Sequence, residues 1–270
     1  MMTYDTRENS LQSGEPIELY QFTYGNNIYR FTSAQTAVSA VGHTWQPAYL
    51  KRSSLDYSAE KSRSNLKIDT NRQFEIADLY MIMPPSDVVL LTVFRLHAGD
   101  GDYAIIWSGR VMGVDFAGST ATMTCEPITT SLKRTGLRRL YQRTCPHVLY
   151  GNACKVNKAS FMLTAALTTV YGTALGCSAF GLYPNGFFAG GYIEFEYNGV
   201  VERRFITGHT GTQITINVPL MGLESGSSVR VYAGCDHTKQ TCSDKFNNLL
   251  NYGGFPYIPQ KNPFGNNGIY

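Results

Sequence analysis

The stretch from Val88 to Pro127, VVLLTVFRLHAGDGDYAIIWSGRVMGVDFAGSTATMTCEP, decides the fold class because it predicts three consecutive strands. Three segments rich in β-branched and aromatic residues are the expected strands: 88–97, 103–116 and 120–127. The connections between them, 99–102 and 117–119, consist of Gly, Asp, Ser and Ala, and most of these residue types favour turns. We therefore expect an antiparallel meander at the centre of a mainly β domain.

Upstream of this stretch the chain continues in the same β-rich manner. Residues 17–24 and 28–32 are separated by a Gly-Asn-Asn turn and predict a β-hairpin. A further short strand is expected at 66–69. A short helix is expected at 73–81, just before a Pro-Pro pair that would end it. Together these segments predict an N-terminal antiparallel β domain.

The composition agrees with a globular, strand-rich protein. Hydrophobic residues make up 43% of the 270 residues, and 18 Tyr, 14 Phe and 26 Gly favour strands and turns over long helices. No apolar run approaches the ~18 residues that a membrane-spanning helix needs, so no membrane partner is expected. The first nine residues, MMTYDTREN, lack the apolar core of a secretory signal, so we expect folding in a reducing cytoplasm.

A basic segment separates the two halves of the chain. Five basic residues lie close together in it: Lys133, Arg134, Arg138, Arg139 and Arg143. We place a domain boundary here, which predicts an N-terminal domain at 1–135 and a C-terminal domain at 136–270. The segment is interpreted either as a solvated linker or as a surface that faces passing DNA. Because the net charge is only +3, DNA contact is not expected.

The C-terminal half contains a second β-rich region. Four segments are its expected strands: 187–197, 200–207, 213–218 and 229–232. They predict a small inserted β-barrel or sandwich at about 171–233, with Asn198-Gly199 as a hairpin turn. Beyond it we expect a short helix at 244–251, and an extended C-terminal arm at 256–270, where Pro, Gly and Asn are frequent.

Four of the six cysteines form two spaced pairs that bracket this insert. Cys145 and Cys154 have eight residues between them, Cys235 and Cys242 have six, and 80 residues separate the pairs. Strands that enter and leave a barrel-like insert can lie side by side, which would bring Cys154 close to Cys235 and all four thiols together. In a reducing compartment, cysteines favour free thiols or a metal site over disulfides.

The spacing leaves three interpretations open. A structural zinc site usually takes its ligands from tight C-x2-4-C turns, with sulfurs only roughly 3.8 Å apart. The wider loops here favour an iron–sulfur cluster, whose ligands lie further apart. Four buried thiols that bind no metal are the third interpretation, which the polar residues around Cys145 and between Cys235 and Cys242 disfavour. Cys125 and Cys177 are expected to be ordinary buried thiols.

Charged residues near the four cysteines are candidates for supporting a cluster. Thiolate-ligated clusters usually carry negative charge, and nearby side chains can offset that charge or donate hydrogen bonds to sulfur. Five residues are close enough in sequence for this role: Arg143, His147, Lys155, His237 and Lys239. The alternative for each of them is an ordinary exposed loop residue.

Motifs around these cysteines resemble those of phage and gene-transfer-agent tail hub proteins. Four segments carry the resemblance: CPHVLYGNAC at 145–154, FFAGG at 187–191, GCDHTKQTCSDKFNN at 234–248 and NYGGFPYIP at 251–259. The eight- and six-residue cysteine spacings are similar to those of the tail tip proteins of lambda-like phages. The resemblance covers roughly residues 136–260 and is weaker before them.

The resemblance implies a cofactor, a place and a set of neighbours. It implies a 4Fe–4S cluster held by Cys145, Cys154, Cys235 and Cys242, and two hub domains in a threefold assembly, a homotrimer, at the virion tail tip. The implied neighbours are the distal tail protein, the central hub or receptor-binding protein, and the tape measure protein. Synthesis would take place in the cytoplasm of the bacterial host.

The expected function is therefore structural, as a component of a tail tip or hub complex that is needed for tail assembly. One alternative is a tail tip protein whose four cysteines hold zinc. Another is a tail-associated cell-wall hydrolase, with Cys145 as nucleophile and His147 or His237 as base. One nucleophile does not explain four paired cysteines, and no H-E-x-x-H, G-x-S-x-G or phosphate-loop pattern occurs, so an enzyme is not expected. A redox role for the cluster stays open.

Overall fold

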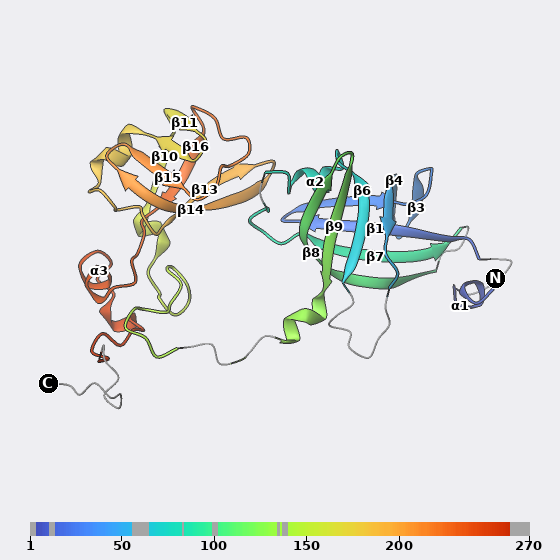
Figure 1. Ribbon diagram of the computed structural model, residues 1–270, viewed down its shortest axis with the longest axis horizontal. Helices are drawn as coiled ribbons and strands as arrows, with labels where there is room; N and C mark the ends of the chain where they lie inside the picture. The colour runs from blue at the N-terminus through green and yellow to red at the C-terminus, as the bar shows by residue number, and fades with distance from the viewer. Residues whose placement is uncertain are drawn as a thin grey trace. The chain divides into compact units, whose positions relative to one another are not determined.

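The computed structural model describes residues 4–10, 14–55, 65–82, 84–98, 102–133, 136 and 140–259. Strands dominate it, which confirms the mainly β fold class (Figure 1). The chain divides into two compact units, residues 1–134 with 198–200 and residues 135–197 with 201–270. No helix among the described residues is long and apolar enough to cross a membrane.

The first unit is built on one nine-stranded sheet. Its strands are β1 (Pro16–Tyr24), β2 (Asn27–Thr32), β3 (Val38–Ala40), β4 (His43–Pro47), β5 (Leu50–Arg52), β6 (Leu66–Asn71), β7 (Leu90–His97), β8 (Tyr103–Ala117) and β9 (Thr120–Pro127). They lie in the order β3-β4-β2-β1-β7-β8-β9-β6-β5. The hairpin β1–β2 and the long strands β7–β9 therefore occupy the middle of the sheet.

The meander predicted from the sequence is confirmed at the centre of this sheet. β7 pairs antiparallel with β8, and β8 with β9. Irregularities at 93–94 and 111–113 shift the register, and such bulges increase the local twist of a strand. The predicted hairpin and the strand at 66–69 are also confirmed. The turn expected at 99–102 lies largely outside the described residues.

Short helices complete the first unit: α1 (Tyr4–Glu8), α2 (Glu75–Asp78) and the 3₁₀ turn η2 (Ile128–Lys133). α2 is shorter than the helix expected at 73–81. Phe74, the residue before it, has an extended backbone and no side-chain capping bond, and its ring is buried in the core. The helix therefore begins only after Phe74, where local sequence preference yields to the packing of one aromatic ring.

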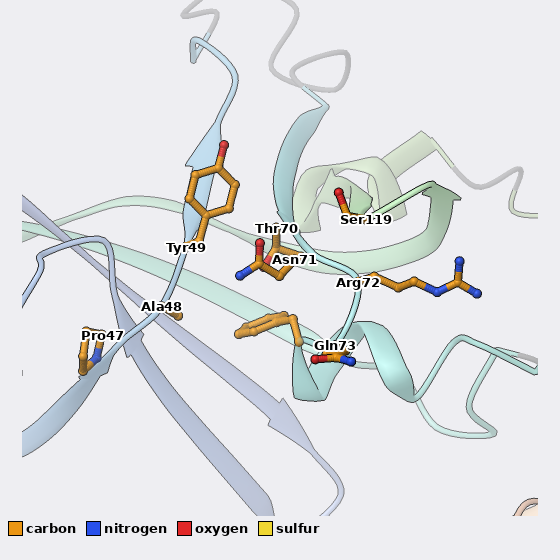
Figure 2. Close-up of a pocket in the computed structure, with 9 residues that line it drawn as sticks. Pro47, Ala48, Tyr49, Thr70, Asn71, Arg72, Gln73 and Ser119 are labelled. Atoms are coloured by element: carbon orange, nitrogen blue, oxygen red, sulfur yellow. The ribbon is translucent and has the colours of Figure 1, made fainter.

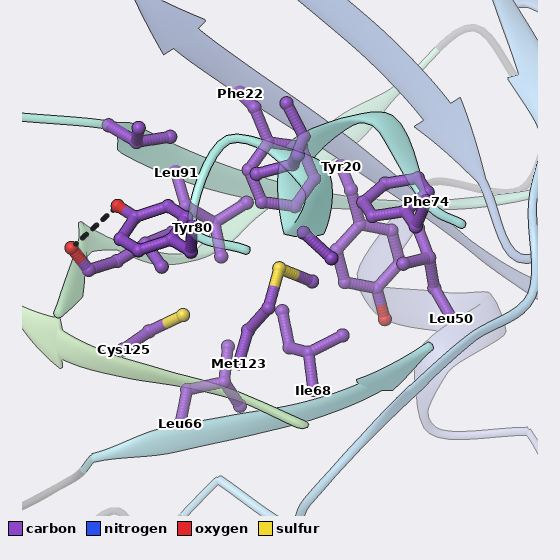
Figure 3. Close-up of a cluster of buried hydrophobic side chains, with 14 of the residues drawn as sticks. Tyr20, Phe22, Leu50, Leu66, Ile68, Phe74, Tyr80, Leu91, Met123 and Cys125 are labelled. Atoms are coloured by element: carbon purple, nitrogen blue, oxygen red, sulfur yellow. Dashed lines mark hydrogen bonds between the residues drawn. The ribbon is translucent and has the colours of Figure 1, made fainter. Parts of the chain in front are cut away.

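The first unit has two buried hydrophobic clusters, a large one and a smaller one of Leu19, Trp45, Phe94 and Leu96. Alternate residues of β6 and β9 point into the large cluster, including Leu66 and Ile68 on β6 and Met123 and Cys125 on β9. Figure 3 shows these side chains around Tyr80, whose hydroxyl donates to the carbonyl of Val111 at 3.3 Å. Cys125 is 0% exposed, which confirms that it is a buried thiol, and burial raises its pKa to about 12.

The second unit contains a seven-stranded sheet that is inserted between the two cysteine pairs. Its strands are β10 (Met162–Ala166), β11 (Thr169–Tyr171), β12 (Ala174–Gly176), β13 (Tyr192–Tyr197), β14 (Val200–Thr210), β15 (Gln213–Ile216) and β16 (Ser228–Tyr232). Their order is β10-β16-β13-β14-β15-β12-β11. The two ends of this order, β10 and β11, follow each other directly in the chain, so the sheet curls back toward itself around a core that includes Cys177, confirmed as buried.

The insert begins earlier than the sequence indicated, at Met162 rather than near residue 171. Strands β10 to β12 were missed because each is only three to five residues long and is rich in Ala, Gly and Thr. Residues 187–191 were expected to open a strand, but the strand begins only at Tyr192. Gly190 adopts a φ of 82°, a left-handed conformation that a strand does not contain.

The helix expected at 244–251 was placed wrongly along the chain. Instead, α3 spans Lys239–Asp244 and a 3₁₀ turn, η5, spans Leu249–Asn251. Thr238 begins α3, because its side-chain oxygen accepts a hydrogen bond from the Thr241 amide at 3.2 Å. Asn247, with a φ of 45°, separates the two helical segments. Two further 3₁₀ turns in this unit are η3 (Lys158–Phe161) and η4 (Ser178–Leu182).

Two expectations rest mainly on residues beyond those described. The C-terminal arm was expected at 256–270; residues 256–259 contain a turn, and 260–270 lie outside the described residues. Most of the basic segment at 133–143, including Arg134, Arg138 and Arg139, lies outside them as well.

Candidate metal centre

The chain entering the insert and the chain leaving it lie side by side. Strand β10 pairs antiparallel with β16, and Met162 lies opposite Tyr232. Cys154 precedes the first of these strands and Cys235 directly follows the second. The pairing therefore brings the two loops that carry Cys154 and Cys235 to the same end of the insert, as the sequence analysis expected.

The four bracketing cysteines come close enough to interact electrostatically. The pKa of the Cys242 thiol is raised, first by burial and then by negative charge on Cys235, Cys145 and Cys154. The pKa of the Cys235 thiol is also raised, again first by burial, and the Cys154 and Cys145 sulfurs contribute. All six cysteines of the chain are free thiols, Cys125 and Cys177 among them. The residues that the sequence analysis grouped together are thus neighbours in the fold.

Three of the four sulfurs accept a hydrogen bond from an N–H group. The Gly253 amide donates to Cys145 Sγ at 3.4 Å, and the His237 amide donates to Cys235 Sγ at 3.3 Å. The side-chain amide of Asn248 lies 3.8 Å from Cys154 Sγ. Such donors stabilise thiolates and tune thiolate-bound metals.

Hydrogen bonds also fasten the loops to one another. The Cys145 amide donates to the carbonyl of His237 at 2.9 Å, which joins the first cysteine pair to the second. The Asn248 side chain donates to the Cys154 carbonyl at 2.6 Å. The Cys242 thiol donates to the Asn248 carbonyl at 3.3 Å, a bond that a metal-bound thiolate would give up. These hydrogen bonds tie the loops of the two cysteine pairs together.

Left-handed backbone conformations occur beside the ligands. Four residues other than glycine have positive φ in these loops: Tyr150 at 61°, Lys155 at 60°, His237 at 62° and Asn247 at 45°. Such conformations are uncommon for residues with a Cβ and cluster at functional sites. Lys155 directly follows one cysteine, and His237 lies two residues after another, so the backbone strain falls where the thiols are turned toward one another.

The four thiols do not form a ready-made site for one metal ion. Among the described residues, no group of three or more His, Cys, Asp or Glu side chains is placed to hold a single metal ion. Tetrahedral zinc requires sulfurs roughly 3.8 Å apart.

An aromatic cluster packs under the cysteine loops and was not found from the sequence. Tyr150 packs edge-to-face against Tyr192, Tyr232 and Phe246. Its hydroxyl donates to the carbonyl of Ala233 at 2.6 Å, two residues before Cys235. Burial raises the pKa of Tyr150 above its ordinary range. The only available signal was the position of Tyr150 between two cysteines, which does not reveal its partners.

Of the nearby charged residues expected to support the cysteines, only His237 hydrogen-bonds to a sulfur; His147, Lys239 and Arg143 bond to other groups. His237 supports Cys235, but through its backbone amide. His147 Nδ1 lies 3.1 Å from the Asn251 carbonyl, and the Lys239 amine donates to the Tyr257 hydroxyl at 2.9 Å. Arg143 contributes its carbonyl, which accepts a bond from the Tyr252 hydroxyl at 2.8 Å.

Lys155, the fifth candidate, is distinguished by its left-handed backbone beside Cys154.

Two residues were missed that contact the cysteine loops directly, Asn248 and Lys245. The Lys245 amine donates to the carbonyls of Phe187 and Gly234, the latter at 2.7 Å. Burial lowers the pKa of Lys245 to about 8. Lys245 lies three residues after Cys242, and its target in the insert loop is far away in the sequence, so no local pattern reveals the contact.

A separate cavity of about 730 Å³ lies in the first unit (Figure 2). Residues 47–49 line one side of it, and 70–74 line the other. None of the sequence-predicted site residues lines this cavity.

Comparison with known proteins places both halves of the chain among phage proteins. A family described as "Baseplate hub protein, N-terminal attachment domain" matches residues 18–157, just over half of the chain. A second family, "Phage conserved hypothetical protein BR0599", matches residues 186–262. The first match contains Cys145 and Cys154, and the second contains Cys235 and Cys242.

Solved structures and curated proteins contain relatives as well. A chain from the "Virion of native gene transfer agent (GTA) particle" is similar with a TM-score of 0.80 and 20% identity, over 97% of this chain and 94% of that chain. An "Uncharacterized protein" of Xylella fastidiosa (strain 9a5c) is 20% identical over 166 residues, 57% of this chain and 35% of that protein. This chain thus spans about a third of that relative's length. At 20% identity, the likeness to the virion chain shows the fold.

The first family match covers enough of the chain to establish membership. The chain belongs to the family of baseplate hub proteins with the N-terminal attachment domain. This membership agrees with the hub protein that the sequence analysis expected.

Proposed function

We propose that this protein is a tail tip hub subunit whose four bracketing cysteines hold a structural 4Fe–4S cluster. Cys145, Cys154, Cys235 and Cys242 would be its ligands. The observation that carries this proposal is the convergence of the four thiols from two segments 80 residues apart. Such a cluster would supply covalent crosslinks between loops that hydrogen bonds and one aromatic cluster already join.

The donor set fits this cofactor. Fe–S clusters are held by cysteine thiolates, and hydrogen bonds to the sulfurs tune them. Here, N–H groups of Gly253 and His237 point at two sulfurs, and the Asn248 amide lies near a third. The wide spacing of the cysteines in the sequence, eight and six residues within the pairs, favours a cluster over the tight turns of a zinc site.

A structural role follows from what surrounds the site. The cysteine loops contain one short helix, α3, and one 3₁₀ turn, η5, and expose apolar side chains such as Val148 and Leu250. A region with so small a core gains little from hydrophobic burial. Binding of a metal to preformed thiolates adds its free energy to folding, on the order of 10 kcal/mol for structural thiolate sites. The cluster would therefore stabilise the second unit.

The proposed place of work is the tail tip, in a homotrimer. The proposed neighbours are the distal tail protein, the central hub or receptor-binding protein and the tape measure protein. Membership in the baseplate hub family supports this setting. The exposed apolar side chains around the cysteine loops, among them Leu140, Tyr141 and Tyr257, are of the kind that protein interfaces cover.

The cofactor is tested by anaerobic purification of the full chain, with assays for iron, sulfide and zinc and an absorption spectrum. We expect about four iron and four sulfide per chain and a broad absorption band near ~400 nm. If the assays find about one zinc per chain, the four cysteines hold a zinc site and not a cluster. Metal-free protein under these conditions would overturn both.

The ligands are tested with a matched pair of variants. Cys235→Ser removes one ligand, whereas Cys177→Ser changes a buried thiol in the core of the insert. Only the first should lose iron. When supplied in place of the wild-type chain during particle production, Cys235→Ser should also block tail assembly, and a wild-type yield of tails from it would contradict the structural role.

A further inference from the structure

The loop at 187–191 and the segment at 233–235 cross with their backbones in direct contact. A Cβ atom added at Gly234 would lie 1.8 Å from the Ala189 carbonyl oxygen, and one added at Gly191 would lie 2.1 Å from the Tyr232 oxygen. No real side chain tolerates such distances, so the crossing requires glycine at both positions. The Gly234 amide also donates to the Phe187 carbonyl at 3.1 Å.

The same loop reaches Cys235 itself. Gly190 has a φ of 82°, and a Cβ added there would lie 2.8 Å from the Cys235 oxygen. The loop is in turn fastened to the insert: the Gly190 amide donates to the Ile206 carbonyl, and the Ile206 amide donates to the Gly191 carbonyl, both at 2.9 Å. The loop at 187–191 thus contacts Cys235 on one side and is hydrogen-bonded to strand β14 on the other.

Lys245 closes this crossing from the other side. Its amine donates to the Gly234 carbonyl at 2.7 Å and to the Phe187 carbonyl, which lie on the two crossing segments. The amine also lies 4.1 Å from the centre of the Phe187 ring. Lys245 is the residue that ends α3, the helix that contains Cys242. One side chain therefore ties the helix of Cys242, the segment of Cys235 and the insert loop together.

We infer that Lys245 is a positioning residue that couples the four-thiol site to the β insert, so that loading of the site stiffens the loop at 187–191. This inference rests on the proposed cluster for its loaded state. Without the ammonium, the Gly234 carbonyl loses this donor, and the Phe187 carbonyl keeps only the Gly234 amide. The loop would then follow Cys235 less tightly. In that variant, binding of metal to the thiols would no longer stiffen the loop at 187–191.

Hydrogen exchange of the full chain, with and without iron, measures this coupling. In the wild type, iron loading should slow exchange at the Gly190, Gly191, Ile206 and Gly234 amides about tenfold. Lys245→Met keeps the length of the side chain and removes its charge and donors, so it should bind iron and lose that slowing. Lys239→Met is the matched control, because the Lys239 amine contacts Tyr257 and not the insert.

A purely structural role would speed exchange equally in the iron-loaded and iron-free states, and equal effects in both would overturn the coupling. The coupling would also be overturned if iron slows hydrogen exchange in Lys245→Met as much as it does in the wild type. Should Lys245→Met fail to fold, Gly190→Ala breaks the crossing from the loop side, where its Cβ meets the Cys235 oxygen. Gly186→Ala is its control, since Gly186 shares the φ of 82° and has no atom within 4 Å of an added Cβ.

The failure of the cluster and the failure of the coupling are distinguishable. If the wild type binds no iron, the proposed cofactor is lost. The contact itself is then tested in the metal-free chain, where Lys245→Met should still speed exchange at Gly234 and Gly190 relative to Lys239→Met. No difference between these two variants would overturn the role of Lys245.

Discussion

The amide nitrogen of Gly253 lies 3.4 Å from the sulfur of Cys145, although 108 positions separate the two residues. The donor comes from the segment after η5, which folds back over the loop of the first cysteine pair. The ring of His147 packs against the same glycine, so that a Cβ added at Gly253 would lie 2.5 Å from the ring atoms Cε1 and Nε2. The contact therefore depends on the absence of a side chain at residue 253.

Gly253→Ala should displace this amide from Cys145. The added methyl group forces either the His147 ring or the backbone to move, at a cost of about 1–3 kcal/mol. We expect a lower iron-to-protein ratio after anaerobic purification and faster loss of iron to a chelator. Gly113→Ala is the control, because no atom lies within 4 Å of a Cβ added there. Equal iron retention in the two variants would contradict the prediction.

Thr238→Ala should loosen the helix that contains Cys242. The Thr238 side-chain oxygen accepts a hydrogen bond from the Thr241 amide at 3.2 Å, and loss of such a cap costs about 1 kcal/mol. Hydrogen exchange at the Thr241 and Cys242 amides should become about fivefold faster. Thr238→Ser keeps the hydroxyl and should restore slow exchange; if the serine variant behaves like alanine, the capping bond is not the cause.

Glu194 should make the second unit sensitive to acid. Its carboxylate is 4% exposed and lies 3.0 Å from Arg203 and 3.3 Å from Arg230. Burial works to raise the pKa of Glu194, but hydrogen bonds from Arg203 and Tyr232 outweigh it and lower the pKa. The stabilisation is therefore present above the unfolded pKa of about 4.3 and is lost as pH falls through the lower folded value.

Thermal unfolding between pH 3 and 7 checks this prediction. At pH 7, Glu194→Gln should lose about 1 kcal/mol and 2–4 °C in Tm, and its stability should depend less on pH in the acid range. Glu196→Gln, an exposed residue on the same strand, is the matched control. If the stability of Glu194→Gln falls with acid as steeply as that of the wild type, another carboxylate controls the acid sensitivity.

The five cysteines other than Cys242 should divide into two groups by reactivity. Alkylation of the metal-free protein near pH 8 should modify the partly exposed Cys145, Cys154 and Cys235, and metal loading should protect them. Cys125 should stay unmodified in both states, because burial raises its pKa to about 12 and leaves little thiolate. Cys177 is 5% exposed and should also resist. Mass spectrometry of tryptic peptides assigns each site, and protection that does not depend on metal would contradict the ligand set.

Strand periodicity decided the centre of the first unit, but the short strands β3, β4 and β5 were not predicted. The meander at 88–127 and the hairpin at 17–32 are rich in β-forming residues and are bounded by clear turn residues, so local preference and burial agree there. In the insert, β10 to β12 escaped prediction because three to five residues of Ala, Gly and Thr contain too little pattern. The position of α3 was missed because its start depends on one capping bond from Thr238, which local apolar spacing does not reveal.

By itself, the sequence determined the fold class, the two pairs of cysteines and their spacing, and the buried character of Cys125 and Cys177. Only the tertiary structure decided which groups surround the sulfurs. Three residues contact the site from distant segments of the chain: Gly253 donates to Cys145, Asn248 donates to Cys154, and Lys245 donates to Gly234 beside Cys235. The physical reason is that hydrogen bonds to sulfur and backbone crossings at glycine depend on distances in space, which local periodicity does not encode.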